Sequence, residues 1–339
     1  MALRTSQRIW ILNKAPTGPV TSETFKLETR PLPALSAGKL LVQVQYISND
    51  PAQRNFIAAG PKPLVAPGNP MRASAVAKVL ESQSTKYKAG DSVFGYFGWT
   101  DYSVVDESAV TAPAAQLPGK PYASISPLGF TSLTAYAGTL DVLDVKPEHT
   151  VVVSGAAGAV GQVVVQLAKN VKGAKRVIGI AGDPDKVAYL KSIGADAAVD
   201  YKAADWKEQL AAIVGADGVD RFYDNVGGDI FDHLLTVLNP HGRVALCGQI
   251  TSYNGEYTPF PHFADIISKS ITIQGFTVFN YISRWGEATK DLRQFIEDGK
   301  LKVAESETVV PTKIEDVPAT WLRLFEGKSR GKLITQLEE

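Results

Sequence analysis

Short apolar runs alternate with turn-forming residues over the first third of the chain. The runs "KLLVQVQYIS", "SAVAKVLES" and "DYSVVDES" are separated by proline- and glycine-rich stretches such as "RPLPALSAGK" and "AAGPKPLVAPGNP". Short strands with turn chemistry between them are typical of β-rich domains. The pattern therefore predicts a β-rich, barrel-like domain over residues 1–125.

After about residue 126 the pattern changes to continuous apolar runs, each followed by a helical stretch. The runs "TVVVSG", "RVIGIAG" and "GRVALCG" alternate with stretches such as "GQVVVQLAKNVKG" and "DPDKVAYLKSIGA". This alternation predicts an α/β fold with a parallel, doubly wound Rossmann sheet, a dinucleotide-binding domain over residues 126–302. The remaining stretch, 303–339, reads as a strand, a helix and a final strand, and we assign it to the first domain.

The first predicted parallel strand runs directly into the small residues "SGAAGAVG". Gly155, Gly158 and Gly161 are spaced three residues apart at the turn into the next helix. Glycines at this place let a pyrophosphate approach the backbone at a helix N-terminus. Close packing of helix on strand is the structural alternative, but the strand and helix units that follow favour a dinucleotide site.

The end of the second predicted strand, "IAGDPDK", bears on which nicotinamide cofactor binds. Gly182 stands at the tip, where an NAD site needs Asp or Glu. Asp183 precedes Pro184, a pair typical of a helix N-cap and first helical residue, so we assign Asp183 the capping role. Lys186 and Tyr201 are then candidates to meet a 2′-phosphate, which favours NADP(H).

Composition narrows the choice of partners and compartment. Of 339 residues, 45% are hydrophobic and 21% charged, and 35 Lys plus Arg balance 35 Asp plus Glu. This balance argues against nucleic acid or an anionic membrane as partner. We expect neither a secretory signal nor the roughly 18 apolar residues of a membrane span. The single cysteine, Cys247, suits a reducing compartment, so we expect a cytoplasmic protein.

Candidate metal ligands are few and scattered. One cysteine excludes a four-cysteine structural zinc site, and a catalytic zinc needs three protein ligands. The four histidines fall in separate predicted loops and helices: His149, His233, His241 and His262. We therefore expect no metal.

Several segments resemble, in order and spacing, the zinc-independent NADPH-dependent alkenal/one oxidoreductases, also called prostaglandin reductases or leukotriene B4 12-hydroxydehydrogenases. These segments are "LTAYAGTL", "SGAAGAVGQVVVQLAK", "AGDPDKVAYLKSIGAD", "YDNVGG", "GRVALCGQITSYN" and "GFTVFNY". The family lies within the medium-chain dehydrogenase/reductase superfamily. The resemblance implies a Rossmann domain interposed in a β-rich GroES-like domain, with NADP(H) as cofactor.

The resemblance also implies which residues hold the cofactor. Tyr253 would lie at the nicotinamide ribose and take the catalytic role, holding the ribose hydroxyl that meets the substrate oxygen. Ser329 stands where the family's "GDNLGK" has asparagine, which puts that contact in doubt. The implied cofactor contacts besides Tyr253 are Thr134, Gly155, Gly158, Ala159, Val160, Gly161, Gly182, Lys186, Tyr201, Asn225, Cys247, Gly248, Phe276, Thr277, Val278 and Ser329. Taken singly, Asn225, Cys247 and Tyr253 also suit a loop cap, a small buried hydrophobe and a loop aromatic.

The activity that the resemblance implies is NADPH-dependent reduction of the C=C bond of an enal or enone. We expect a small hydrophobic carbonyl compound in a pocket between the domains. The family's "DPYMR" reads "NDPAQR" here, so Ala52 replaces a tyrosine and the pocket is altered. The expected substrate contacts are Asn49, Ala52, Arg54, Met71, Trp99 and Tyr281. Trp99 could equally be plain core of the β-rich domain.

Two other functions stay open at this point. A quinone reductase of the same superfamily would share the glycine loop and lack zinc, and a catalytically inactive NADPH-binding regulator would tolerate the altered "NDPAQR" segment. The late segment "SITIQGFTVFN" predicts an edge strand, and pairing of such edges across a two-fold axis would give a homodimer.

Overall fold

The computed structural model describes residues 4–60, 63–255 and 257–338. Residues 1–3, 61–62, 256 and 339, which fall within the predicted domain segments, lie outside the described residues. The chain forms two compact units. Unit 1 comprises Met1–Ser126, Thr308–Ser329 and Leu333–Glu339, and unit 2 comprises Pro127–Glu307 and Arg330–Lys332. The stretch 303–339 thus contributes to both units.

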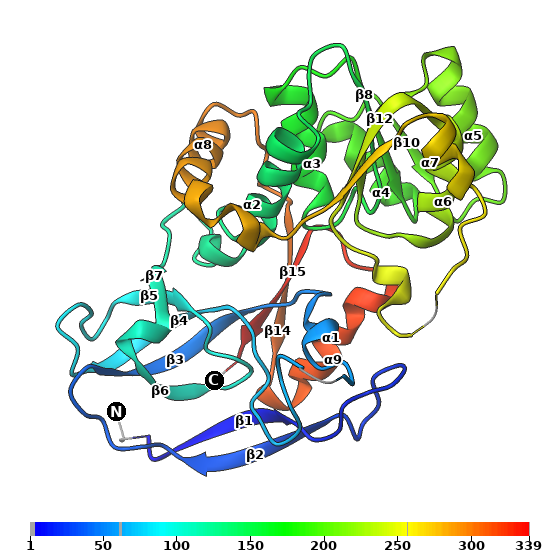
Figure 1. Ribbon diagram of the computed structural model, residues 1–339. Helices are drawn as coiled ribbons and strands as arrows, with labels where there is room; N and C mark the ends of the chain where they lie inside the picture. Colours follow the sequence, from blue (N-terminus) through cyan, green and yellow to red (C-terminus); the bar gives the residue numbers. More distant parts are fainter. Residues whose placement is uncertain (1–3, 61–62, 256, 339) are drawn as a thin grey trace. The chain divides into compact units, whose positions relative to one another are not determined.

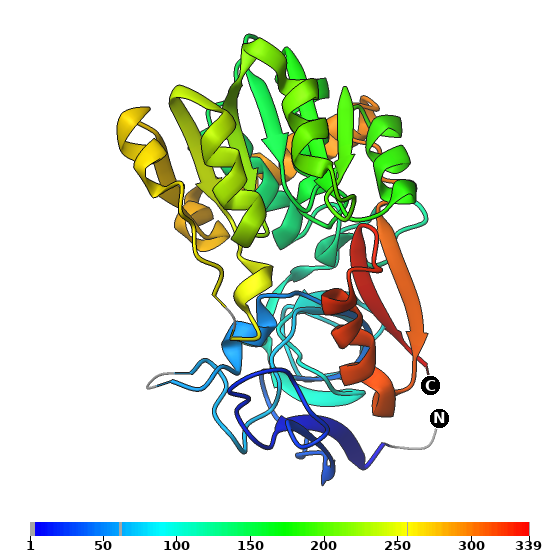
Figure 2. The ribbon, with the colours of Figure 1, turned by 90° about the vertical axis from the view of Figure 1, so that its right-hand side faces the viewer.

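Unit 1 is built on a seven-stranded sheet, as the alternation of short apolar runs and turns predicts. Its strands are β3 (Lys39–Ser48), β4 (Ala75–Ser82), β5 (Ser92–Gly95), β6 (Tyr102–Asp106), β7 (Val110–Pro113), β14 (Glu307–Thr312) and β15 (Lys332–Leu337). The order is β14-β15-β3-β4-β5-β7, with β6 also paired to β3. The orange β14 and the red β15 lie side by side in Figure 2. The C-terminal strands therefore complete a sheet begun by the N-terminal ones.

A separate hairpin and several short helices complete unit 1. Strands β1 (Ser6–Leu12) and β2 (Phe25–Pro31) pair antiparallel as a two-stranded sheet, which the sequence analysis did not predict. The helices of this unit are α1 (Gln53–Phe56), α9 (Val317–Leu322) and the 3-10 helices η1 (Glu107–Ala109), η2 (Ala123–Ile125), η8 (Ile314–Asp316) and η9 (Arg323–Glu326).

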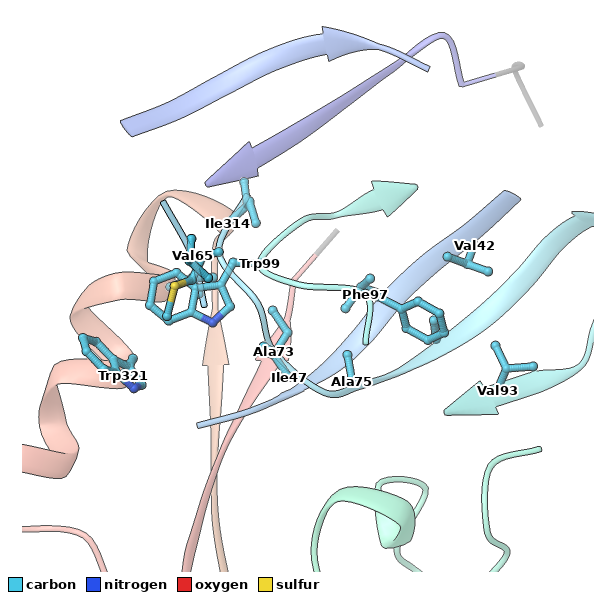
Figure 3. Packing of buried hydrophobic residues seen from close by; sticks show 14 of the residues in the cluster. Val42, Ile47, Val65, Ala73, Ala75, Val93, Phe97, Trp99, Ile314 and Trp321 are labelled. Carbon is cyan, nitrogen blue, oxygen red and sulfur yellow. The ribbon is translucent and has the colours of Figure 1, made fainter. Parts of the chain in front are cut away.

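Aromatic rings form the centre of the unit 1 core. Figure 3 shows Trp99 and Trp321 among aliphatic side chains that include Val65 and Ile314. The Trp99 ring lies 5.6 Å from that of Trp321 and 5.1 Å from that of Phe25, centroid to centroid, in tilted and edge-on arrangements. Such arrangements add stability beyond the area that the rings bury. The rings thus tie α9 and the hairpin to the sheet.

Unit 2 has the six-stranded parallel sheet that the alternating pattern predicts. Its strands are β8 (Thr150–Val153), β9 (Arg176–Ala181), β10 (Ala197–Asp200), β11 (Val219–Asp224), β12 (Leu238–Leu246) and β13 (Thr272–Gly275). All neighbouring pairs are parallel, in the order β10-β9-β8-β11-β12-β13. The order reverses between β8 and β11, which is where doubly wound sheets bind their ligands.

The helices of unit 2 precede β8, connect successive strands of this sheet, and follow β13. They are α2 (Phe130–Tyr136) with π-helix η3 (Ala137–Val142), α3 (Gly161–Gln166) with π-helix η4 (Leu167–Val171), α4 (Pro184–Ser192), α5 (Trp206–Val214), η5 (Gly215–Asp217), α6 (Gly228–Val237), η6 (Ile250–Ser252), α7 (Phe263–Ser268), η7 (Val278–Arg284) and α8 (Trp285–Glu297). Figure 1 shows α2 beside both α3 and α8, and α2 packs on each of these two helices. Within the described chain, no helix has the length and apolarity to cross a membrane.

Candidate functional site

The glycine loop joins β8 to α3 and brings the two very close together. Gly155 has φ +55°, a left-handed conformation that turns the chain at the strand end. A Cβ on Gly161 would lie 2.6 Å from the Ala156 Cα and would also meet the Gly155 carbonyl oxygen. Gly155 and Gly161 therefore have the tight-turn and close-packing roles of a dinucleotide fingerprint. The helix begins at Gly161, slightly later than the predicted start near residue 159 or 160.

The glycine loop is also held by a distant part of the chain. The Gly331 N–H donates to the Ala157 carbonyl at 2.8 Å, and Gly331 forms a parallel bridge with Gly158. The next residue, Lys332, donates its N–H to the Ser306 carbonyl at 2.8 Å. Residues 330–332 thus fix the outer side of the turn, where Gly158, Ala159 and Val160 are partly exposed.

The ends of β9 and β10 form the region predicted for the adenosine half of the cofactor. Asp183 is the N-cap of α4, and its carboxylate accepts the Lys186 N–H at 2.8 Å, so the predicted capping role is confirmed. The Lys186 ammonium lies 3.6 Å from the same carboxylate. The Tyr201 ring covers Gly182, because a Cβ on Gly182 would lie 2.6 Å from it. Lys186 and Tyr201 therefore flank a strand tip that carries no side chain.

A buried carboxylate shapes the turn after β11. Asp224 accepts hydrogen bonds from the Ser154 hydroxyl at 2.6 Å and from the N–H groups of Val226 and Gly227 at 3.0 and 3.1 Å. Burial raises the pKa of Asp224, and these three donors oppose that shift. The Asn225 side chain donates to the Ser154 carbonyl at 2.7 Å, so it ties the end of β11 to the end of β8. The bond gives Asn225 a structural role between two strands, and its cofactor contact stays a prediction.

The end of β12 brings Cys247, Gly248 and Tyr253 together. The Cys247 and Gly248 N–H groups both donate to the Asp224 carbonyl, at 2.8 and 3.2 Å. A Cβ on Gly248 would lie 3.2 Å from the Tyr253 hydroxyl oxygen and 3.1 Å from the Asn225 carbonyl oxygen. The Tyr253 hydroxyl therefore lies over bare backbone next to the predicted cofactor residues. Desolvation raises the pKa of the Cys247 thiol to about 12, so this thiol stays protonated at neutral pH.

The last strand of the sheet leads into the third predicted cofactor segment. Phe276 and Val278 are buried, whereas Thr277 begins η7 with a capping box to Asn280. The Phe276 ring stands edge-on to that of Tyr281, with centroids 6.2 Å apart. Tyr281 therefore packs beside the cofactor segment, and its predicted substrate contact stays a prediction.

Tyr223, which the sequence analysis missed, lies in the interior of unit 2 and contacts two of the predicted cofactor segments, at Thr134 and at Phe276. It lies in β11 with no exposed surface, and its hydroxyl donates to the Thr134 carbonyl at 3.1 Å. Its ring stands edge-on to Phe276, with centroids 6.1 Å apart. The alternation of β11 was the available signal, because it turns Tyr223 to the face opposite Phe222.

Two family models match the chain. The model described as the N-terminal domain of oxidoreductase matches residues 8–112, and the one described as zinc-binding dehydrogenase matches residues 159–295. Prostaglandin reductase 1 of Rattus norvegicus is 36% identical over 97% of this chain and 98% of its own length. The chain belongs to the prostaglandin reductase family. This family lies within the medium-chain dehydrogenases/reductases, as the sequence segments indicate.

Two further proteins are similar to this chain over nearly its full length. The NADPH-dependent curcumin reductase of Escherichia coli is 34% identical, covering 97% of this chain and 96% of the relative. The structure of CurA from Vibrio vulnificus in complex with NADPH is 34% identical and has a TM-score of 0.89, covering 98% of this chain and 99% of that one. These similarities confirm the fold of two units with a Rossmann sheet.

The side chains of the described residues do not fit zinc, despite the description of the second family model. His149 accepts the Lys146 N–H at its Nδ1, and His262 bonds Asp232 at 2.6 Å. His241 lies within β12 rather than in a plain turn, with φ +63°. Across residues 4–60, 63–255 and 257–338, no group of three or more His, Cys, Asp or Glu side chains could hold a metal ion. We therefore assign no step of the chemistry to zinc.

The substrate contacts predicted in unit 1 need correction at two residues. Trp99 and Met71 have no exposed surface and belong to the core, so we no longer assign them to a substrate pocket. Asn49 donates to the Thr335 hydroxyl at 3.0 Å, and Arg54 donates to the Gly18 carbonyl at 2.7 Å. Both side chains are buried, and burial lowers the pKa of Arg54.

Two other predicted residues of unit 1 are placed differently. Ala52 is exposed at the start of α1, and its substrate contact stays a prediction. Ser329 is half-buried, and its hydroxyl has no hydrogen-bond partner among the described residues. Its contact with the cofactor likewise stays a prediction.

Proposed function

We propose that this protein reduces the C=C bond of α,β-unsaturated aldehydes and ketones, with NADPH as the hydride donor. The supporting relatives are named prostaglandin reductase and NADPH-dependent curcumin reductase. The single observation that carries the proposal is the Tyr253 hydroxyl over Gly248, at the same sheet edge as the glycine loop.

The residues at this edge suit NADP(H). Gly161 lets the helix pack closely on the strand, and the glycine loop has no large side chain that would keep a pyrophosphate from its backbone. The strand tip at Gly182 lacks the carboxylate that would bind a ribose 2′-hydroxyl in an NAD site. Asp183, the acidic residue next to this tip in the sequence, serves as the helix cap, and its carboxylate lies beside the Lys186 ammonium. Lys186 and Tyr201 would hold the 2′-phosphate, and Asn225, Cys247 and Phe276 would lie along the nicotinamide half.

NADPH, when bound, supplies a hydride to the β-carbon of the conjugated bond. Negative charge then develops on the carbonyl oxygen, and we place the Tyr253 hydroxyl on that side as the group that organises hydrogen bonding to it. One donor of this kind contributes on the order of 3 kcal/mol to transition-state stabilisation. Water then protonates the α-carbon of the enolate, so the product is the saturated carbonyl compound.

The test is to incubate the purified protein with NADPH and a simple enone, and to identify the product by mass spectrometry and NMR. We expect a saturated ketone and equimolar NADP. An allylic alcohol with an intact C=C bond would contradict the proposal.

The same assay separates the two other functions. A quinone turned over much faster than any enal or enone would favour a quinone reductase. Saturable NADPH binding without turnover of any electrophile would favour a regulatory protein.

We further propose a cytoplasmic homodimer. Strand β13 stands at the end of the parallel sheet, so its outer edge suits pairing with a second copy. Light scattering at micromolar concentration should give twice the chain mass, and a monomer mass would contradict this assembly. The lone cysteine, Cys247, suits a reducing compartment.

A further inference from the structure

We propose that Tyr223 is a positioning residue that fixes the nicotinamide half of the cofactor site from beneath the sheet edge. Tyr223 contacts three segments that we assign to that half, through Thr134, Cys247 and Phe276. The inference rests on the proposed function, because it assumes that these segments line the cofactor. Tyr223 itself is fully buried and acts only through its neighbours.

The Tyr223 hydroxyl lies beside two of the segments. Its O–H donates to the Thr134 carbonyl at 3.1 Å. The Cys247 thiol is close enough to this hydroxyl that each group affects the pKa of the other. The buried ring therefore places one oxygen atom between the two segments.

Thr134 lies near the end of α2, just before the π-helix η3. Its carbonyl accepts the N–H of Ala137 within the helix as well as the Tyr223 hydroxyl from the sheet. The Thr134 hydroxyl donates to the Phe130 carbonyl at 2.7 Å, so this side chain is tied into its own helix. The bond from Tyr223 therefore connects Thr134 directly to the sheet.

The ring of Tyr223 positions the third segment, at Phe276, by direct packing. It packs edge-on to Phe276, and both rings lie against the bare backbone of Gly138 in η3. A Cβ on Gly138 would come 2.7 Å from the Phe276 ring and would also meet the Tyr223 ring. The absence of a side chain at this position lets the helix approach both rings.

The deciding variant is Tyr223→Phe, which removes the hydroxyl and keeps the ring against Gly138 and Phe276. Its control is Phe222→Leu, which changes the adjacent residue on the opposite face of β11, in the core with Leu234 and Leu235. The readouts are the melting temperature, the Kd for NADPH, the emission of bound NADPH, kcat with an enone, and the isotope effect with 4-deuterated NADPH.

For Tyr223→Phe we expect a Kd for NADPH within about twofold of wild type, because the adenosine half is untouched. We expect kcat to fall about tenfold or more, since small misplacement of reacting groups costs rate, with a larger isotope effect and altered nicotinamide emission. Phe222→Leu should lower the melting temperature at least as much while changing neither kcat nor emission.

Two results would overturn the proposal. One is a Tyr223→Phe protein with kcat, isotope effect and emission equal to those of wild type. The other is an equal loss of kcat in Phe222→Leu, which would indicate a merely structural role. If the wild-type protein binds NADPH but reduces no enone, the proposed function fails, and the emission of bound NADPH still tests Tyr223.

Discussion

The two units both bury polar side chains, but they differ in what stands at their strand ends. In unit 2, small and polar residues gather at the carboxyl ends of parallel strands, where Gly182, Asn225 and Gly248 follow three different strands. In unit 1, buried polar groups hold the unit's own loops, as Arg54 does by donating to the backbone carbonyls of Pro16 and Gly18. A doubly wound sheet has one edge at which a ligand can bind, whereas the polar groups of the β-rich unit satisfy its own backbone.

This difference indicates where a substitution should affect binding and where it should affect only stability. Changes at the strand ends of unit 2 should alter cofactor affinity or rate in a folded protein. Changes at the buried residues of unit 1 should alter the free energy of unfolding. The following variants test that division, beginning with the largest expected effect.

Gly161→Ala should abolish NADPH binding, and it should destabilise the protein as well. The added Cβ would lie 2.6 Å from the Ala156 Cα, so the glycine loop must shift. The control is Gly286→Ala in α8, where a Cβ would meet nothing within 4 Å. That change should leave binding unaltered and stabilise the helix by about 0.5 kcal/mol or more. Titration followed by nicotinamide fluorescence checks both, and equal affinities for the two variants would contradict the role of the loop.

Trp99→Ala should lower the free energy of unfolding by about 3–5 kcal/mol, because it removes a ring at the centre of the unit 1 core. The Kd for NADPH of the folded protein should stay within about twofold. Leu64→Ala serves as control, since Leu64 is 61% exposed and its loss should cost less than about 0.5 kcal/mol. Urea unfolding measures the difference. A stable Trp99→Ala protein with a raised KM for the enone would restore Trp99 to the substrate site.

Tyr253→Phe should reduce kcat about 100-fold, in proportion to roughly 3 kcal/mol of lost oxyanion stabilisation. The KM for NADPH should change little, because the remaining cofactor contacts are retained. Tyr257→Phe alters a tyrosine that is 81% exposed, and it should behave as wild type. Steady-state kinetics with an enone gives both values, and a kcat within twofold of wild type for Tyr253→Phe would refute the catalytic assignment.

Lys186→Ala should weaken NADPH binding by about 2 kcal/mol, or roughly thirtyfold, through loss of a charge-assisted hydrogen bond to the 2′-phosphate. NADH binding should not change, since NADH lacks that phosphate. Lys191→Ala removes an exposed charge from the same helix, α4, and should affect neither cofactor. Equal weakening of both cofactors by Lys186→Ala would indicate a structural role beside Asp183.

Elements with a strong periodic pattern could be predicted from the sequence. Strand β3 covers the whole of "KLLVQVQYIS", and β9 covers "RVIGIA". The hairpin of β1 and β2 was missed, because "FKLETRP" is rich in charged residues and has only Phe25 buried, so it lacks a clear apolar pattern. The residues that we assign to the cofactor could be placed at one sheet edge from the sequence, because parallel strand topology brings the ends of distant strands together.

Other features depend on contacts that no local pattern encodes. Nothing in the run around Trp99 says whether the ring points to the core or to a ligand, and only packing against Trp321 decides it. Tyr223 has an ordinary place in a buried strand, and its importance comes from a hydrogen bond to Thr134, 89 positions away.

The bridge between Gly331 and the glycine loop has a consequence for the making of this protein. The β8–α3 turn joins residues that are neighbours in the sequence, whereas the bond from the Gly331 N–H to the Ala157 carbonyl closes a long segment of chain. Closing such a segment costs conformational entropy, which has to be offset by contacts made within it. We therefore expect the nucleotide loop to gain its outer support only after the strands between these two residues have folded.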